Sequence, residues 1–151
     1  MSAHTENSKY QHQRLQAIRS AAAVFAEKGF HGSSTRDIAE HMGIKQGSLY
    51  YYFKSKEELV QSFYERTHEA HIEAIDGILA KERSFKVRLR LVMEAKIKTV
   101  MPYRRVSSQL FRSAADPESP LNLFSEQSAD LRNRATDVMR VVIEGSRQKV
   151  A

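Results

Sequence analysis

Residues Gly43 to Leu59 read GIKQGSLYYYFKSKEEL, and this stretch decides the fold. Three consecutive tyrosines, at 50–52, follow a glycine-containing turn and precede a charged run. Side chains at consecutive helix positions point in different directions, so one short helix cannot bury all three rings on the same face. At least one of these tyrosines must therefore face solvent, and the residues around it should explain why.

The apolar residues before this stretch recur at helical spacing, which predicts a helix over residues 11–28. Gly29 directly after it supplies a C-terminal stop. Residues 1–10 are polar, and we expect them to be disordered. The residues that set the helical period are Leu15, Ile18, Ala22 and Phe25.

Two capping boxes mark the helices on either side of the tyrosines. Ser34 with Asp37 opens a short second helix, which ends at Gly43, and Ser55 with Glu58 opens a long fourth helix reaching about residue 80. Between them lies a short third helix, on which Leu49 and Phe53 are four residues apart and form its inward seam.

Helical spacing continues to the end of the chain, so the predicted fold class is all-α. Ser84 caps a fifth helix, Pro102 opens a sixth, and a last amphipathic helix begins near Ser125. We expect an N-terminal domain of three helices over residues 11–56, joined by the long fourth helix to a C-terminal helical domain over residues 57–151.

The charge is concentrated in the N-terminal domain. The net charge is +6, and residues 1–56 hold eight Lys or Arg against four Asp or Glu, whereas residues 57–151 hold sixteen against fourteen. A basic surface at a helical unit favours a polyanionic partner. A second basic run, residues 83–105, is read as a solvated helical face, with a membrane-surface role as the alternative.

Several functions are disfavoured by missing features. The chain has no cysteine, so it has no disulfide and no thiolate metal site. It shows no membrane-spanning run and no signal-peptide apolar region, which predicts a cytoplasmic protein. No nucleophile motif, P-loop or dinucleotide loop occurs, so we expect neither an enzyme nor a cofactor. Glu65, His68 and His71 are read as exposed residues on a polar helix face rather than as metal ligands.

Two short helices joined by a tight turn and braced by a preceding helix make a helix-turn-helix unit. The second helix of such a unit can enter the DNA major groove with its N-terminal residues at the base edges. Those residues are Lys45, Gln46, Gly47 and Ser48. Lysine suits phosphate or guanine, glutamine suits adenine, glycine permits close approach of the backbone, and serine bonds a phosphate or a base. The tyrosines then form a DNA-facing edge, with Tyr52 partly packed inside.

The segment GFHGSSTRDIAEHMGIKQGSLYYYFKSKEELV resembles the DNA-binding domain of TetR-family transcriptional regulators over residues 12–60. The Gly-Phe pair ending helix one, the serines before helix two and the LYxxFKxKExL segment carry the resemblance. Thr35 departs from it, because an aliphatic residue is usual there. The resemblance implies double-stranded DNA as the partner and assigns phosphate or base contacts to Ser33, Ser34, Lys45, Gln46, Ser48, Tyr50, Tyr51 and Lys56.

The resemblance also implies a C-terminal domain with a small-molecule pocket and a dimer interface. Large apolar side chains in that domain predict an apolar or amphipathic effector, with an ordinary packed core as the alternative. Ligand binding would then shift the fourth helix and the spacing of the two DNA-binding heads, as expected of a repressor. The candidate ligand-binding residues are Phe85, Leu89, Met101, Tyr103, Ser107 and Phe111.

Members of the family carry a further pair of C-terminal helices that form a homodimer, and this sequence ends before them. We therefore expect the 151-residue chain by itself to be monomeric or a weak dimer, with an exposed apolar end at Val138, Val141, Val142 and Ile143. The competing hypothesis is a lipid- or partner-binding helical protein that keeps the same fold without binding DNA.

Overall fold

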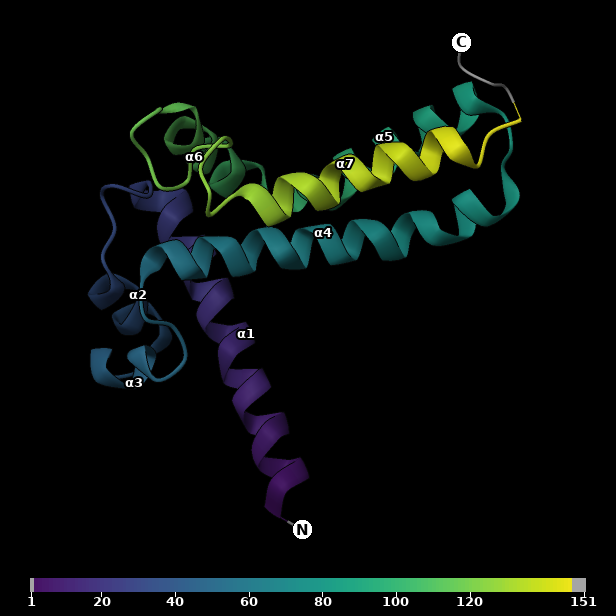
Figure 1. Cartoon of the computed structure of the whole chain (residues 1–151). Coiled ribbons are helices and arrows are strands. Elements are labelled where there is room, and N and C mark those ends of the chain that lie inside the picture. Colours follow the sequence, from purple (N-terminus) through teal and green to yellow (C-terminus); the bar gives the residue numbers. More distant parts are fainter. Residues whose placement is uncertain (1, 148–151) are drawn as a thin grey trace. The chain divides into compact units, whose positions relative to one another are not determined.

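A computed structural model describes residues 2–147, with side chains from residue 6 onward, and every regular element in this range is a helix (Figure 1). The predicted all-α class is confirmed. In chain order the elements are α1 (Ser2–Lys28), α2 (Thr35–Met42), α3 (Gln46–Tyr50), α4 (Lys56–Lys81), α5 (Phe85–Val100), the 3-10 turn η1 (Met101–Tyr103), α6 (Arg104–Ala115) and α7 (Ala129–Glu144). No helix among them is both long enough and apolar enough to cross a bilayer.

Two helix starts differ from the expectation. α1 begins at Ser2, where disorder was expected, because residues 2–10 contain neither proline nor glycine to end a helix that propagates backward from its apolar part. α7 begins at Ala129, since residues 117–128 form turns after Pro117.

The chain divides into two compact units, and the division differs from the one expected at residue 56. One unit comprises Met1–Phe63 with Arg105–Asn122, and the other comprises Tyr64–Arg104 with Leu123–Ala151. We call them the N-terminal unit and the C-terminal unit. Residues 105–115 of α6 belong to the N-terminal unit, and the apolar face of α6 is buried at Val106, Leu110 and Ala114.

The core of the N-terminal unit is built around α1. Phe25 near the end of α1 and Phe30 just after it are both buried, with ring centroids 5.7 Å apart. Leu49 of α3 and Phe53, three residues after its end, are also buried, which confirms the predicted inward seam. Other buried apolar side chains of this unit are Ala17, Ile18, Ala21, Val24, Ile38, Ala39, Leu59, Val60 and Phe63.

The core of the C-terminal unit joins α4, α5 and α7. Its buried residues are Ile75, Val92, Ala95, Val138 and Val142. Phe85 and Leu89, which were predicted to bind a ligand, are partly buried and pack against this core. Their spacing of four residues on α5 serves helix packing, as apolar residues at helical spacing commonly do.

The Arg88 side chain is fully buried in this unit. It belongs to the basic run over residues 83–105, so the predicted solvated face is wrong for this residue. Its Nε donates to the carbonyl of Val142 at 3.0 Å, Nη2 donates to Val141 at 2.7 Å, and Nη1 donates to Leu79 and Glu82 at 2.8 and 2.7 Å. The last carbonyls of a helix have no partner within it. Arg88 therefore closes the C-terminal ends of α4 and α7 together.

Gly145 completes this arrangement. A Cβ atom at residue 145 would collide with the Arg88 guanidinium, so a larger residue there would have to displace this group from its hydrogen bonds.

Replacing Arg88 by methionine should therefore cost stability. The substitution leaves buried carbonyls without donors, and we expect a loss of about 3 kcal/mol or more in the free energy of unfolding. Arg90→Met is the matched control: Arg90 lies on the same helix, and its ion pair with Glu94 is exposed, so its loss should change stability by about 1 kcal/mol or less. Equal melting temperatures for the two variants would contradict the closing role of Arg88.

Candidate nucleic-acid interface

The turn between α2 and α3 has the geometry that the sequence predicts. Gly43 ends α2 in the left-handed conformation, with φ at 75°, which disfavours any residue with a Cβ. Its N–H and that of Ile44 bond back to the carbonyls of Glu40 and Ala39 at 3.0 Å each. α3 then begins after Lys45, so residues 45–48 lie at the start of the second helix of the pair.

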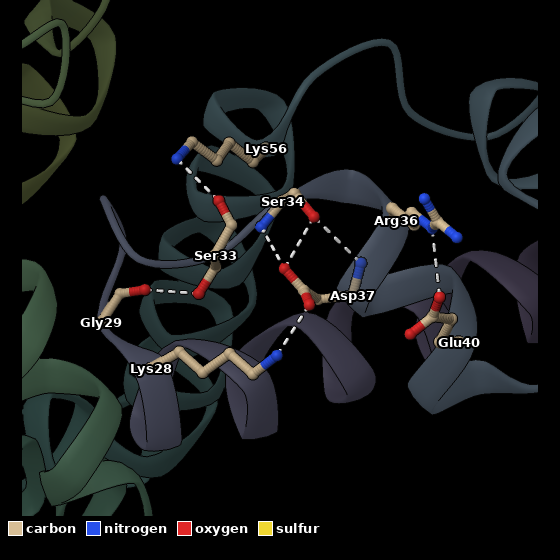
Figure 2. A network of polar contacts seen from close by, with 8 residues as sticks. All are labelled: Lys28, Gly29, Ser33, Ser34, Arg36, Asp37, Glu40 and Lys56. Atoms are coloured by element: carbon tan, nitrogen blue, oxygen red, sulfur yellow. Dashed lines mark hydrogen bonds and ion pairs between the residues drawn. The ribbon is translucent and has the colours of Figure 1, made fainter.

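The predicted capping box at the start of α2 is present in full (Figure 2). The Ser34 hydroxyl accepts from the Asp37 N–H at 3.1 Å, and the Asp37 carboxylate accepts from the Ser34 N–H at 2.8 Å. Lys28 at the end of α1 pairs with the other carboxylate oxygen at 2.7 Å. The Lys28 ammonium, followed by the Ser34 hydroxyl and N–H, holds the pKa of Asp37 well below its usual range. This network fixes the end of α1 to the start of α2.

Ser33 does not occupy the position expected of a phosphate contact. Its side chain is buried, and its hydroxyl donates to the carbonyl of Gly29 (Figure 2). A hydroxyl has a single proton to donate, and here that proton is used inside the protein. Ser34 is exposed, but its hydroxyl is engaged with Asp37. The loop serines thus organise the start of α2.

Lys56 also points inward, which differs from the backbone clamp implied by the resemblance. Its ammonium donates to the carbonyls of Phe30 and Ser33 at 2.7 and 2.9 Å and lies 4.3 Å from the centre of the Phe30 ring. The first residue of α4 therefore holds the loop between α1 and α2.

Gln46 belongs to a polar triad that links α2 to α3. Its Nε2 lies 2.8 Å from the Thr35 hydroxyl and 3.4 Å from the Tyr50 hydroxyl, and these two hydroxyls are 3.1 Å apart. An aliphatic residue, which is usual at position 35 in the family, could not form these contacts, so the triad depends on the Thr35 hydroxyl. The triad restricts the rotamers of a residue predicted to read a base.

The tyrosine run is divided between surface and interior as expected. Tyr51 is 73% exposed, Tyr50 is 45% exposed and Tyr52 is half-buried. Tyr10 of α1 contacts Tyr51 and Tyr52, with its ring centroid 5.7 Å from that of Tyr51 and 5.3 Å from that of Tyr52. Edge-to-face contacts of this kind orient a ring. Sequence reasoning missed Tyr10, because it lies in the segment predicted to be disordered.

Arg14 of α1 makes a second contact, with the segment that follows α3. The Arg14 guanidinium lies 4.3 Å from the centre of the Phe53 ring and reaches the carbonyl of Tyr52 at 3.4 Å.

The predicted contact residues thus fall into two sets. Ser33 and Lys56 are used internally, and Tyr52 packs beside Tyr10. The exposed set forms the candidate interface, and a Cβ at Gly47 would meet no protein atom within 4 Å, so its backbone can be approached closely. The candidate interface consists of Lys45, Gln46, Gly47, Ser48, Tyr50 and Tyr51 on α3 and its cap.

The candidate effector residues divide between the two units, with Ser107 and Phe111 in the N-terminal unit and the other four in the C-terminal unit. Met101, Tyr103 and Phe111 are exposed, Ser107 is half-buried, and Phe85 and Leu89 pack on the core of the C-terminal unit. Two cavities of that unit have other linings. One, of 380 Å³, lies between α4 and α5 and is lined by Ala74, Ile78, Leu91, Glu94, Ala95, Lys98 and Thr99. The other, of 280 Å³, lies between α4 and α7.

The two histidines of α4 are buried, although the sequence placed them on an exposed face. His71 contacts the carbonyl of Val92 at 3.0 Å, so its Nε2 carries the proton. Burial lowers the pKa of both His68 and His71, and the positive charges of Lys96 and Arg134 lower that of His68 further. Glu65 pairs with Arg134 rather than with a histidine.

Comparison with known proteins identifies the N-terminal unit. Residues 17–63 match the family profile described as bacterial regulatory proteins, tetR family. The fatty acid metabolism regulator protein of Bacillus subtilis is 33% identical over 79 residues, which cover 52% of this chain and 41% of that protein. The transcriptional repressor KstR2 of Mycobacterium tuberculosis is 51% identical over 47 residues, covering 31% of this chain and 24% of that protein. The matched region spans less than half of the length of these curated relatives.

Solved structures share the fold beyond the N-terminal unit. A TetR/AcrR-family regulator from Thermobifida fusca superposes with a TM-score of 0.64 at 25% identity, covering 88% of this chain and 67% of that one. The regulator FadR of Bacillus subtilis, solved with stearoyl-CoA, superposes with a TM-score of 0.73 at 19% identity, covering 91% and 75%. The second likeness concerns the fold alone.

Substitution of Lys56, which bonds the loop between α1 and α2, should affect stability, whereas substitution of Lys45, which precedes α3, should affect DNA binding. Lys56→Met should lower the free energy of unfolding by about 2 kcal/mol, since two carbonyls lose a charged donor. Lys45 is exposed, so Lys45→Met should change stability by about 0.5 kcal/mol or less and should weaken DNA binding. Thermal unfolding and a DNA titration measure both. A Lys56→Met variant with unchanged stability but weakened DNA binding would restore Lys56 to the phosphate contact.

Tyr10 and Tyr51 should act as one unit. Tyr10→Ala removes the ring that orients Tyr51, so each single substitution should weaken DNA binding and the double substitution should cost less than their sum. We expect a coupling of about 0.5–1.5 kcal/mol in a double-mutant cycle, the range for aromatic pairs. Tyr10→Phe keeps the ring and should bind as the parent does. Strictly additive effects would mean that Tyr10 does not position Tyr51.

Proposed function

We propose that this chain, whose residues 17–63 match the tetR family of bacterial regulatory proteins, is a ligand-responsive DNA-binding transcriptional repressor. The observation that carries the proposal is the exposed start of α3. Lys45, Gln46 and Ser48 are presented there by a helix pair whose ends are fixed by the Ser34–Asp37 box and by Lys56. A rigidly held helix start is what readout of base edges requires.

The roles divide by chemistry. Lys45 supplies charge for phosphate, Gln46 supplies the amide that pairs with adenine, and Tyr51 supplies an apolar face for a thymine methyl or a sugar. We propose that two copies bind a palindromic site, because a two-fold dimer sets the spacing of two reading heads on DNA. Regulators of this family are not enzymes, and no catalytic step is assigned to the chain.

For the effector, we propose an amphipathic molecule bound by the C-terminal unit. The support comes from relatives: one matched protein is named a regulator of fatty acid metabolism, and a structure of the same fold was solved with stearoyl-CoA. The apolar cavities along α4 are compatible with such a ligand.

Selection of bound sequences from a random duplex pool, followed by titration at several salt concentrations, tests the DNA-binding function. The selected site should be palindromic, and its affinity should fall by roughly a thousandfold or more between 50 and 200 mM salt if about six to ten phosphates are neutralised. No enrichment, together with salt-independent binding, would favour a helical protein that keeps this fold for a lipid or protein partner.

Gln46→Ala separates base readout from phosphate contact. It should relax the preference at one base pair in each half-site, at about 1–3 kcal/mol for each, and leave the salt dependence unchanged. Lys45→Ala, one residue away, should weaken all sequences about equally and reduce the salt slope by about one for each half-site. If neither variant changes binding to the selected site, α3 does not enter the groove.

A further inference from the structure

The polar triad at the edge of the candidate interface joins the first residues of two helices. Gln46 is the first residue of α3, Tyr50 lies one turn later on the same helix, and Thr35 is the first residue of α2. Gln46 Nε2 donates to the Thr35 hydroxyl at 2.8 Å and to the Tyr50 hydroxyl at 3.4 Å. The two hydroxyls lie 3.1 Å apart and share a further hydrogen bond.

The number of available protons decides which way the Gln46 amide faces. Each of the contacts within the triad needs one proton. When Nε2 faces the hydroxyls, the amide supplies both of its protons and one hydroxyl supplies its own, so every contact is satisfied. When Oε1 faces them, only the hydroxyl protons remain, and one contact is left without a proton. The amide nitrogen therefore faces Thr35 and Tyr50, and the carbonyl oxygen faces away from them.

This orientation leaves Gln46 with a free acceptor and no free donor. The Gln46 side chain is exposed, and its Oε1 makes no hydrogen bond to any group within residues 6–147. A glutamine that pairs with adenine through two hydrogen bonds offers its oxygen to the N6 amino group and an amide proton to N7. Both amide protons of Gln46 are already directed at hydroxyls, so the bond to N7 is not available.

Stabilisation of the helix pair is the alternative role for the triad. Gln46 and Tyr50 are exposed and Thr35 is half-buried, so water competes for their hydrogen-bonding groups. Neutral hydrogen bonds of this kind contribute little to the net stability. The orientation of the amide, by contrast, determines whether the side chain offers a donor or an acceptor to a base. The triad therefore bears on recognition more than on stability.

We infer that Thr35 determines what Gln46 reads: the triad presents Oε1 as a lone acceptor, which recognises the exocyclic amino group of adenine or cytosine in the major groove. The keto oxygens of guanine and thymine are themselves acceptors, so opposite Oε1 they would lose water without gaining a hydrogen bond. The N7 atom of a purine takes no part in the contact. This inference rests on the proposed function and refines it, because one hydrogen bond to an amino group takes the place of a two-bond contact with adenine.

Duplexes with single base atoms removed test the inference, because every base pair carries both an amino and a keto group in the major groove. The pair to alter is the one at which Gln46→Ala relaxes the preference. In three separate duplexes, the amino group is deleted, the keto oxygen is deleted, or the purine N7 is replaced by carbon. Each is titrated with the parent chain and with Gln46→Ala.

Loss of the amino group should weaken binding by the parent about tenfold, the factor for one hydrogen bond, and should leave Gln46→Ala unaffected. Loss of the keto oxygen or of N7 should cause no change that depends on Gln46.

Thr35→Val should alter this pattern. Valine keeps the shape of the side chain but has no hydroxyl, so the Gln46 amide can turn and offer a proton to the DNA. Loss of N7 or of the keto oxygen should then become costly, while the dependence on the amino group falls. Thr35→Ser keeps the hydroxyl and is the matched control, which should behave as the parent does.

Gln46→Glu tests the same point without a change in α2. A glutamate carboxylate has acceptor oxygens and no proton to donate at neutral pH, so this variant should keep the dependence on the amino group although its charge weakens binding overall. Melting temperatures within about 2–4 °C of the parent show that the variants remain folded.

Three results would overturn the inference. A parent chain that loses affinity, through Gln46, when the keto oxygen or N7 is removed would mean that Nε2 faces the groove. A Thr35→Val variant that keeps the parent pattern would mean that the hydroxyl does not orient the amide. A chain that enriches no duplex from the random pool would overturn the proposed function as well, which distinguishes that failure from the other two.

Discussion

The Lys56 ammonium is the contact on which the N-terminal unit most depends. It donates hydrogen bonds to two carbonyls of the loop between α1 and α2, those of Phe30 and Ser33, and lies against the Phe30 ring. Charge-assisted hydrogen bonds are about twice as strong as neutral ones, and these two are partly shielded from water. They fix the path of the chain from the end of α1 to the start of α2. Because α3 follows α2 through a tight turn at Gly43, this contact and the Lys28–Asp37–Ser34 network together set the position of the candidate interface.

The polar residues of this unit thus have two roles, internal hydrogen bonding and candidate DNA contact, which the sequence alone does not distinguish. One set of polar residues stabilises the loop between α1 and α2 through contacts inside the protein, which form without bound DNA. This set consists of Lys28, Ser33, Ser34 and Asp37. Residues 45–48 contribute little to internal bonding apart from Gln46. Preorganisation by the first set lowers the cost of ordering the second when DNA binds. The internal hydrogen bonds of Ser33 and Ser34 give both serines a structural role that needs no phosphate contact.

Local chemistry was predictable, whereas long-range contacts were not. The Ser34–Asp37 box, the stops at Gly29 and Gly43 and the buried pair Leu49 and Phe53 depend on neighbours within a few residues, so the sequence pattern predicted them.

The contacts that were missed join residues far apart in the chain. Tyr10 meets Tyr51, Thr35 meets Gln46, and Arg88 meets the end of α7. Arg88 is one of eight basic residues between 83 and 105, and nothing local distinguishes it from its exposed neighbours. The orientation of the Lys56 side chain was also not predictable from the sequence, since a lysine at a helix start can point to solvent or back to the preceding loop.

In the proposed function, the start of α3, held by the loop contacts, is the surface that meets DNA. The most direct measurement is a titration of the isotope-labelled chain with a short DNA duplex, followed by backbone amide chemical shifts. The amides of Thr35 and of residues 45–51 should shift most, while the Phe30 and Ser33 region keeps its hydrogen bonds to Lys56. Saturating duplex that leaves residues 45–51 unchanged, or shifts only amides of the C-terminal unit, would contradict it.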